Sequence, residues 1–261
     1  MSKCTVRTVY ERLNEIAPFE TSESYDNTGL LIGDWDAAAD RILCSLDVTA
    51  DTVAEAVKYG AQLIVSHHPL MFHGTKRLIK GDPESDVIAS LLRHGISLIS
   101  AHTNMDQTFL SGSASVARGL QVNGLRQSGY LFTGDFERPV AAGEIVDKIR
   151  NIFAAPVRLY GDPNKRITTM SFAGGAYGEG YLEALGENAQ AYLTGEFRHH
   201  EIIDGTARGL CLFEMGHYAS EAPMIPGLCQ YLRERLPDGV MISETCSRPF
   251  YGAITQVGGP T

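Results

Sequence analysis

Histidine and carboxylate side chains follow several apolar runs in this sequence, at the points where strands would end. The first run begins at Gln62 and stops on the adjacent His67 and His68, with Pro69 directly after them. A run this rich in Leu, Ile and Val is typical of a strand buried on both faces of a parallel sheet. Neighbouring side chains of a strand point to opposite faces, so the two histidines share a site only if the strand has ended, which Pro69 favours.

A lone pair of adjacent histidines is more often one core and one surface residue, but further clusters favour a shared site. A second apolar run is followed at once by His102 and then by Asp106. A third run precedes His217 and Glu221. A helix that begins at His217 would place these two side chains four residues apart on one face. Each cluster therefore offers groups that bind metals or accept protons.

A fourth run leads to Arg198 and the pair His199 and His200, so most of the eight histidines lie in these clusters. In open α/β sheets the carboxyl ends of the strands line the ligand crevice. Chance placement would scatter the histidines along the chain. We therefore expect the clusters to converge on one crevice.

The composition is that of an ordinary globular protein, with 44% hydrophobic residues and a net charge of −9. The acidic charge argues against nonspecific binding to nucleic acids. No apolar run approaches the roughly 20 residues that span a bilayer, and no apolar signal core follows Met1, so we expect a cytoplasmic protein without a membrane partner. The five cysteines are widely spaced and lack a Cys-x-x-Cys pair, which argues against a disulfide framework and a thiolate zinc site.

Strand-like runs alternate with amphipathic segments along the chain, which predicts an α/β fold. Expected helices include residues 5–17, 49–59 and 83–94, and expected strands include residues 41–46, 62–66 and 96–100. We expect two related α/β lobes, residues 1–128 and residues 129–261, with the site in the crevice between them. A terminal strand at residues 240–243 is free to return to the first lobe.

Six motifs, in this order and spread over nearly the whole chain, resemble the GTP cyclohydrolase I type 2 homologues, also called NGG-interacting-factor-three-like proteins. They are YDNTGLLIG (25–33), LDVT (46–49), IVSHHPLMF (64–72), AHTNMD (101–106), TGEFRHHE (194–201) and GHYASE (216–221). The combination of His-His-Pro after a buried strand with a downstream Gly-His-Tyr-x-x-Glu is highly specific. The chain resembles the short form of the family, because it has no room for the domain that longer members insert between the lobes.

This resemblance implies two α/β lobes, a homohexameric toroid and a two-metal centre that faces its interior. The implied metal ligands are His67, His68, Asp106, His217 and Glu221. His102 would be a sixth ligand or a partner of the ligands, and His200 matches a family position near the pocket. His199 departs from the family, because many relatives carry an aromatic residue there.

Three imidazoles and two carboxylates are too many for one closed tetrahedral zinc site, but they suit two metal ions bridged by a carboxylate and a water. Mixed nitrogen and oxygen ligation without a thiolate admits two divalent ions of Zn, Mn, Fe, Co or Ni per chain. Such a centre would lower the pKa of a water and make it a nucleophile, with Glu221 or His102 as the proton acceptor.

Two classes of function follow from the resemblance. The family name implies a hydrolase in which activated water attacks the purine C8 of GTP, or a related small molecule, and releases formate. Lys76 and Arg198 would then contact the phosphates, although a basic loop such as residues 74–80 is equally consistent with a simple solvated surface. The alternative is a non-enzymatic metal-binding ring that stores or delivers ions or serves as a protein adaptor.

Overall fold

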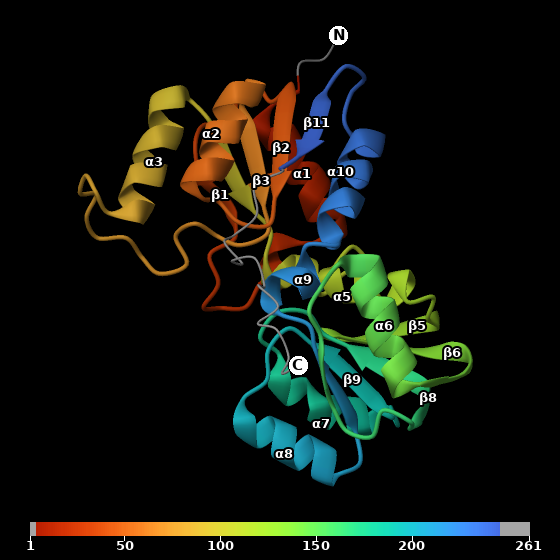
Figure 1. The fold of residues 1–261 in the computed structure, drawn as a ribbon. Helices are drawn as coiled ribbons and strands as arrows, with labels where there is room; N and C mark the ends of the chain where they lie inside the picture. The colour runs from red at the N-terminus through yellow and green to blue at the C-terminus, as the bar shows by residue number, and fades with distance from the viewer. Residues whose placement is uncertain (1–3, 246–261) are drawn as a thin grey trace, which may run out of the picture.

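The computed structural model describes residues 4–245, and in this part of the chain two β-sheets are each covered by helices on both faces (Figure 1). The predicted α/β class with two sheets is therefore confirmed. No helix among these residues is long and apolar enough to cross a membrane. The four described cysteines are buried and unbridged, whereas Cys246 lies outside the described residues.

The first sheet has five strands in the order β1-β4-β3-β2-β11, and only the edge strand β1 runs antiparallel to its neighbour. The strands are β1 (Gly29–Ile32), β2 (Arg41–Ser45), β3 (Leu63–Ser66), β4 (Ser97–Ser100) and β11 (Met241–Glu244). Alternate residues of β3 enter opposite cores: Leu63 and Val65 pack with α1 (Val6–Ile16) and α10 (Met224–Arg235), whereas Ile64 packs with α2 (Ala50–Tyr59) and α3 (Pro83–His94). Burial on both faces explains why β3 reads as a continuous apolar run.

Local signals set the ends of these helices. The side-chain oxygens of Thr5, Thr49 and Asp82 accept hydrogen bonds from the first turns of α1, α2 and α3, as N-cap residues do. Gly60 and Gly95 end α2 and α3 with positive φ angles of 72° and 64°, a conformation that glycine adopts without strain.

The second sheet has six strands in the order β5-β6-β8-β9-β10-β7. They are β5 (Asn123–Ser128), β6 (Leu131–Ala141), β7 (Arg158–Tyr160), β8 (Arg166–Phe172), β9 (Ala191–Thr194) and β10 (Cys211–Glu214). Its central strands β8, β9 and β10 are parallel. One face packs against α5 (Gly112–Gly119) and α6 (Ala142–Phe153), and the other packs against α7 (Tyr181–Gly186) and α8 (His199–Ala207).

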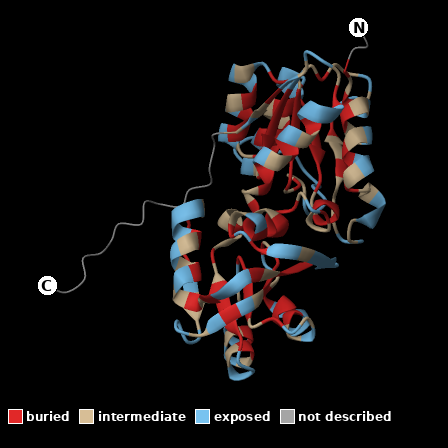
Figure 2. Cartoon of the chain, turned by 90° about the vertical axis from the view of Figure 1, so that its right-hand side faces the viewer, coloured by how far each residue is buried: buried red, intermediate tan, exposed pale blue. Residues whose placement is uncertain are grey.

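The chain passes between the two sheets twice. It leaves the first sheet through α4 (Thr103–Asp106) and α5, and it returns through α9 (His217–Glu221) to α10 and β11. β11 pairs with β2 in the first sheet. Two short turns of 3-10 helix, η1 (Phe19–Thr21) and η2 (Gly178–Gly180), complete the described elements. Figure 2 shows the buried strands of both sheets between partly exposed helices.

The structure corrects the expected boundary between the lobes. β5 lies before residue 129 but pairs with β6 in the second sheet, and α5 contributes Ala114 and Val116 to the core of that sheet. Because β5 has mostly exposed side chains, it lacks the apolar pattern that would have assigned it to either lobe.

Candidate metal centre

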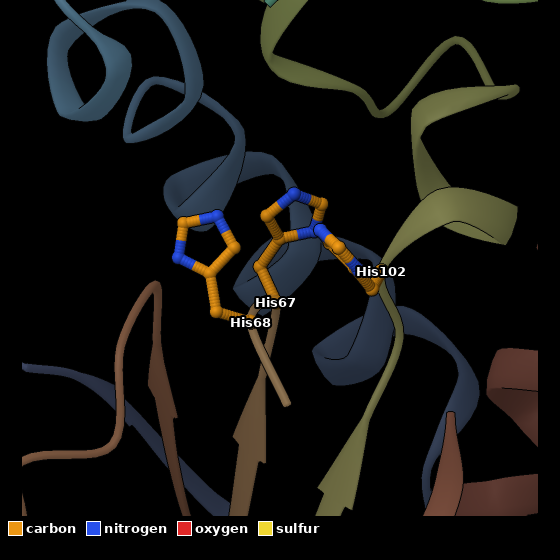
Figure 3. A group of neighbouring side chains, drawn as sticks. All are labelled: His67, His68 and His102. Carbon is orange, nitrogen blue, oxygen red and sulfur yellow. The ribbon is translucent and has the colours of Figure 1, made fainter. Parts of the chain in front are cut away.

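The carboxyl ends of strands from both sheets meet at one place, and this place holds the clustered histidines. His67 and His68 directly follow β3, and His102 lies two residues beyond the end of the neighbouring β4. Figure 3 shows the three rings projecting from the ends of these strands toward a common space. The centroid of the His67 ring lies 4.9 Å from that of His68 and 5.1 Å from that of His102. The strand-end pattern in the sequence therefore reflects a real convergence.

The remaining groups come from two short helices that connect the sheets. Asp106 ends α4, and its Oδ1 lies 3.5 Å from His67 Nε2. His217 and Glu221 lie four residues apart on α9, as the sequence predicted, with His217 Nε2 3.2 Å from Glu221 Oε2. The same carboxylate oxygen lies 3.0 Å from His68 Nε2.

The ligand atoms fall into three groups, within each of which they lie no more than 4.8 Å apart. The groups are His67, His68 and His102; His68, His217 and Glu221; and His67, Asp106 and Glu221. His67, His68 and Glu221 each belong to two groups. The structure thus brings together the five residues that the resemblance implies as ligands, and His102 lies in a group with His67 and His68.

Each of the four imidazoles has its Nδ1 atom fixed by an acceptor. His67 Nδ1 lies 2.9 Å from the Ala101 carbonyl, and the other three meet carboxylates. The distances are 2.8 Å from His68 to Asp47, 2.9 Å from His102 to Asp26, and 3.0 Å from His217 to Glu196. Carbonyl and carboxylate oxygens only accept hydrogen bonds, so Nδ1 must donate and the neutral ring presents its Nε2 lone pair to the shared space.

Three buried polar atoms of this centre have no hydrogen-bond partner among residues 4–245: His67 Nε2, His68 Nε2 and Glu221 Oε2. His68 Nε2 and Glu221 Oε2 lie 3.0 Å from each other. Leaving such atoms unsatisfied costs about 1–3 kcal/mol each. Because all three are electron-pair donors once His68 Nε2 has lost its proton, a divalent cation that displaces this proton would satisfy them together. The residues therefore fit a metal ion.

The buried charges shift the pKa values of the centre in opposite directions. Burial lowers the pKa of His67 to about 3. Burial also opposes the charged form of His68, but the hydrogen bond that His68 donates to Asp47 and the nearby carboxylate of Glu221 outweigh it and raise the pKa of His68 to about 10. Burial, followed by the charge of Glu221, raises the pKa of Asp106 well above its ordinary value. Without a metal, the centre thus retains protons that metal binding would displace.

A glycine turn leaves room for Glu221. Gly174 and Gly175 follow β8, and Gly175 has a positive φ of 65°. A Cβ atom on Gly175 would lie 2.3 Å from Glu221 Oε1, closer than real contacts allow. The backbone N–H of Gly175 donates to Ser220 Oγ at 2.9 Å. This turn therefore holds α9 at the centre.

The residues predicted to bind substrate are not members of these ligand groups. Lys76 is exposed in the loop after β3, Arg198 precedes α8 and is exposed, and His199 and His200 are exposed at the start of α8. The buried Glu201 contacts Arg198 instead, accepting a hydrogen bond from its backbone N–H at 2.6 Å. The predicted roles of Lys76, Arg198 and His200 in substrate binding stay predictions.

Three functional candidates were not singled out from the sequence, namely the carboxylates Asp26, Asp47 and Glu196 that orient the histidines. A signal existed for Asp47, because it lies two residues beyond the end of β2, the neighbour of β3. Aspartate is common in turns, so Asp26 reads as a turn residue in the sequence. Its contact with His102 joins residues 76 positions apart. Burial opposes the charged form of Asp26, but hydrogen bonds from His102 and Thr103 outweigh it and lower the pKa of Asp26 to about 2.

Comparisons with known proteins support one family. Residues 4–249 match the family model described as Duf34/NIF3 (NGG1p interacting factor 3). A Clostridium perfringens protein named GTP cyclohydrolase 1 type 2 homolog is 28% identical over 250 residues, covering 91% of this chain and 95% of the relative. A Streptomyces coelicolor protein of the same name is 29% identical over 230 residues, covering 82% of this chain and 81% of the relative.

Solved structures show the same fold. A hypothetical protein of Staphylococcus aureus superposes with a TM-score of 0.88 at 23% identity, covering 94% of this chain and 97% of the other. A Bacillus cereus protein related to NIF3 superposes with a TM-score of 0.89 at 16% identity, covering 96% of this chain and 99% of the other. At these identities the likeness concerns the fold alone.

Proposed function

Because the chain belongs to the Duf34/NIF3 family, we propose that it is a dinuclear metal-dependent hydrolase acting on a purine nucleotide or a related small molecule. The observation that carries the proposal is the set of Nε2 lone pairs and carboxylate oxygens that face one space, three of them buried without a hydrogen-bond partner. The relatives named GTP cyclohydrolase 1 type 2 homolog support a nucleotide as the substrate class.

The number of donors supports two ions rather than one. Six residues contribute to three overlapping ligand groups, whereas a closed tetrahedral site needs four ligands. The donors are imidazole nitrogens and carboxylate oxygens without a thiolate, a set that suits Zn, Mn, Fe, Co or Ni. His67, His68 and Glu221 would be the shared residues, because each belongs to two groups.

When bound, the ions would lower the pKa of a water and polarise the bond that it attacks. Glu221 keeps its negative charge, because its contacts with His217 and His68 outweigh the effect of burial and lower its pKa. Its carboxylate would therefore be in the ionised form that a proton acceptor requires. His102 is the second candidate, because Asp26 fixes its Nδ1 and leaves Nε2 available to hold or pass on a proton.

The test is turnover of a panel of nucleotides by the metal-loaded protein, with His217→Ala as the ligand-deficient control. We expect the wild-type protein to hydrolyse at least one purine nucleotide and the variant to lose this activity. A protein that binds ions but turns over no nucleotide with any of the five metals would instead support the metal-storage or adaptor function.

We extend the proposal to a homohexamer, which rests on the family resemblance. Light scattering at micromolar concentration tests it directly: a mass six times that of the chain is expected, and a monomer would contradict the assembly.

A further inference from the structure

Two large aromatic side chains at the metal centre remain exposed. The side chain of Tyr25 is 65% exposed and that of Phe72 is 39% exposed. Their ring centroids lie 6.3 Å apart, with the ring planes at 65° to each other. Single exposed apolar residues are ordinary, but adjacent exposed rings beside a polar site are typical of a surface that contacts a ligand. We call this pair the aromatic corner.

The aromatic corner lies next to the candidate metal ligands, both in space and in the sequence. The ring of Phe72 lies 6.1 Å from that of His102, nearly perpendicular to it, and Phe72 lies four residues after His68. Tyr25 directly precedes Asp26, the carboxylate that holds His102. Each ring is therefore positioned by a segment that also positions the centre.

A hydrogen bond fixes the two segments to each other. Asn27, two residues after Tyr25, donates from Nδ2 to the carbonyl of Met71 at 2.7 Å, and Met71 directly precedes Phe72. The second lobe supports the same loop, because Tyr130 OH donates to Glu23 Oε1 at 2.8 Å. The geometry of the corner is therefore set by contacts that do not involve the exposed ring faces. Within residues 4–245, the ring contacts of the two residues are those with each other, with His73 and with His102.

We propose that Tyr25 and Phe72 position a planar aromatic ring of the substrate beside the metal centre. The inference rests on the metal centre proposed above and adds the residues that select the substrate. Two rings at a steep angle can offer one face for stacking and one edge for a T-shaped contact, and both are favourable arrangements for a further ring. A nucleobase has this chemistry, whereas a saturated ring lacks it.

The experiment compares two probes with the same metal-binding group, benzohydroxamate and cyclohexanecarbohydroxamate. Their affinities for the metal-loaded protein are measured by calorimetry for the wild type, Phe72→Leu, Phe72→Tyr and Tyr25→Leu. Phe109→Leu is the matched control, because Phe109 is 49% exposed and its ring packs on Phe132 rather than on the centre. Metal content and light scattering are recorded for every variant.

We expect Phe72→Leu and Tyr25→Leu to weaken benzohydroxamate binding by about 2- to 10-fold, as loss of an aromatic contact does, with little change for the saturated probe. Phe72→Tyr should retain the wild-type preference, and Phe109→Leu should not alter it. The proposal would be overturned if the two probes lost affinity equally or if neither lost affinity. It would also be overturned if benzohydroxamate did not bind to the wild type. A change of oligomeric state without a change in preference would also overturn it, because the rings would then contact another copy.

The outcome is separable from that of the hydrolase proposal. Binding is measured without turnover, so a selective loss of the aromatic probe would support the corner even if no nucleotide were hydrolysed. Conversely, the wild type could hydrolyse a nucleotide while Phe72→Leu kept the wild-type preference for benzohydroxamate over the saturated probe. This result would support the hydrolase proposal and contradict the role of the aromatic corner.

Discussion

Asp47 and Glu221 hold the two nitrogens of the same imidazole: Asp47 Oδ1 lies 2.8 Å from His68 Nδ1, and Glu221 Oε2 lies 3.0 Å from His68 Nε2. The first contact fixes the tautomer and the ring orientation, so that the second nitrogen is presented to the centre. A carboxylate behind a histidine also makes the ring a stronger metal donor.

Replacing Asp47 should therefore weaken metal binding although Asp47 is not a ligand. We expect Asp47→Asn to lower metal affinity by about 10- to 100-fold, the usual effect of losing such a partner. Asp51→Asn is the control, because Asp51 is exposed in the first turn of α2. Competition with a chromogenic chelator measures both. Equal affinities in the two variants would remove Asp47 from the support of the centre.

Asp26 and His102 should behave as one unit. We expect His102→Asn to reduce metal affinity or activity by about 10- to 100-fold and Asp26→Asn to produce part of that loss. The double variant should be no worse than His102→Asn alone, because Asp26 acts through His102. Additive losses in this double-mutant cycle would show that Asp26 has a separate role.

Metal binding should release protons at neutral pH. His68 has a pKa raised to about 10, and the pKa of Asp106 is raised above its ordinary value, so both retain protons until a metal displaces them. The affinity should therefore rise with pH until His68 loses its proton at about pH 10. For His68 in the metal-free protein the sign is opposite: its contribution to folding stability is complete below its ordinary pKa and is lost as the pH rises through about 10.

Calorimetry in buffers with different enthalpies of ionisation measures this proton release. A heat of metal binding that does not depend on the buffer would contradict it.

Glu221 should be required for hydrolysis beyond its part in retaining metal. Glu221→Gln preserves size and removes the charge, so it should weaken metal binding and lower the rate by about 10²- to 10⁴-fold even when metal is restored in excess. Glu234→Gln, on the exposed face of α10, is the control. Robust hydrolysis by metal-restored Glu221→Gln would rule out Glu221 as the proton acceptor while leaving the hydrolase class intact.

Much of the positioning framework could be predicted from sequence, because its signals are local. The double burial of β3 produces a continuous apolar run, and residues such as Thr49 and Gly60 set the ends of α2 through contacts within a few positions. The strand-end placement of His67 and His102 then follows from the parallel pairing of β3 and β4.

The partners of the histidines could not be predicted in the same way. Asp26 meets His102 across 76 positions, and Glu196 meets His217 across 21 positions. These contacts depend on how the two sheets are joined, which no local pattern records. The pairing of β5 with β6 has the same cause, since the mostly exposed residues of β5 carry no signal of the sheet that they join.

Elemental analysis of the purified protein shows whether this cluster of imidazoles and carboxylates holds metal. We expect the wild type to carry about two transition-metal ions per chain and His68→Ala to lose most of them, because His68 belongs to two of the three ligand groups. Circular dichroism should show that the variant remains folded. A folded His68→Ala protein with unchanged metal content would contradict the account.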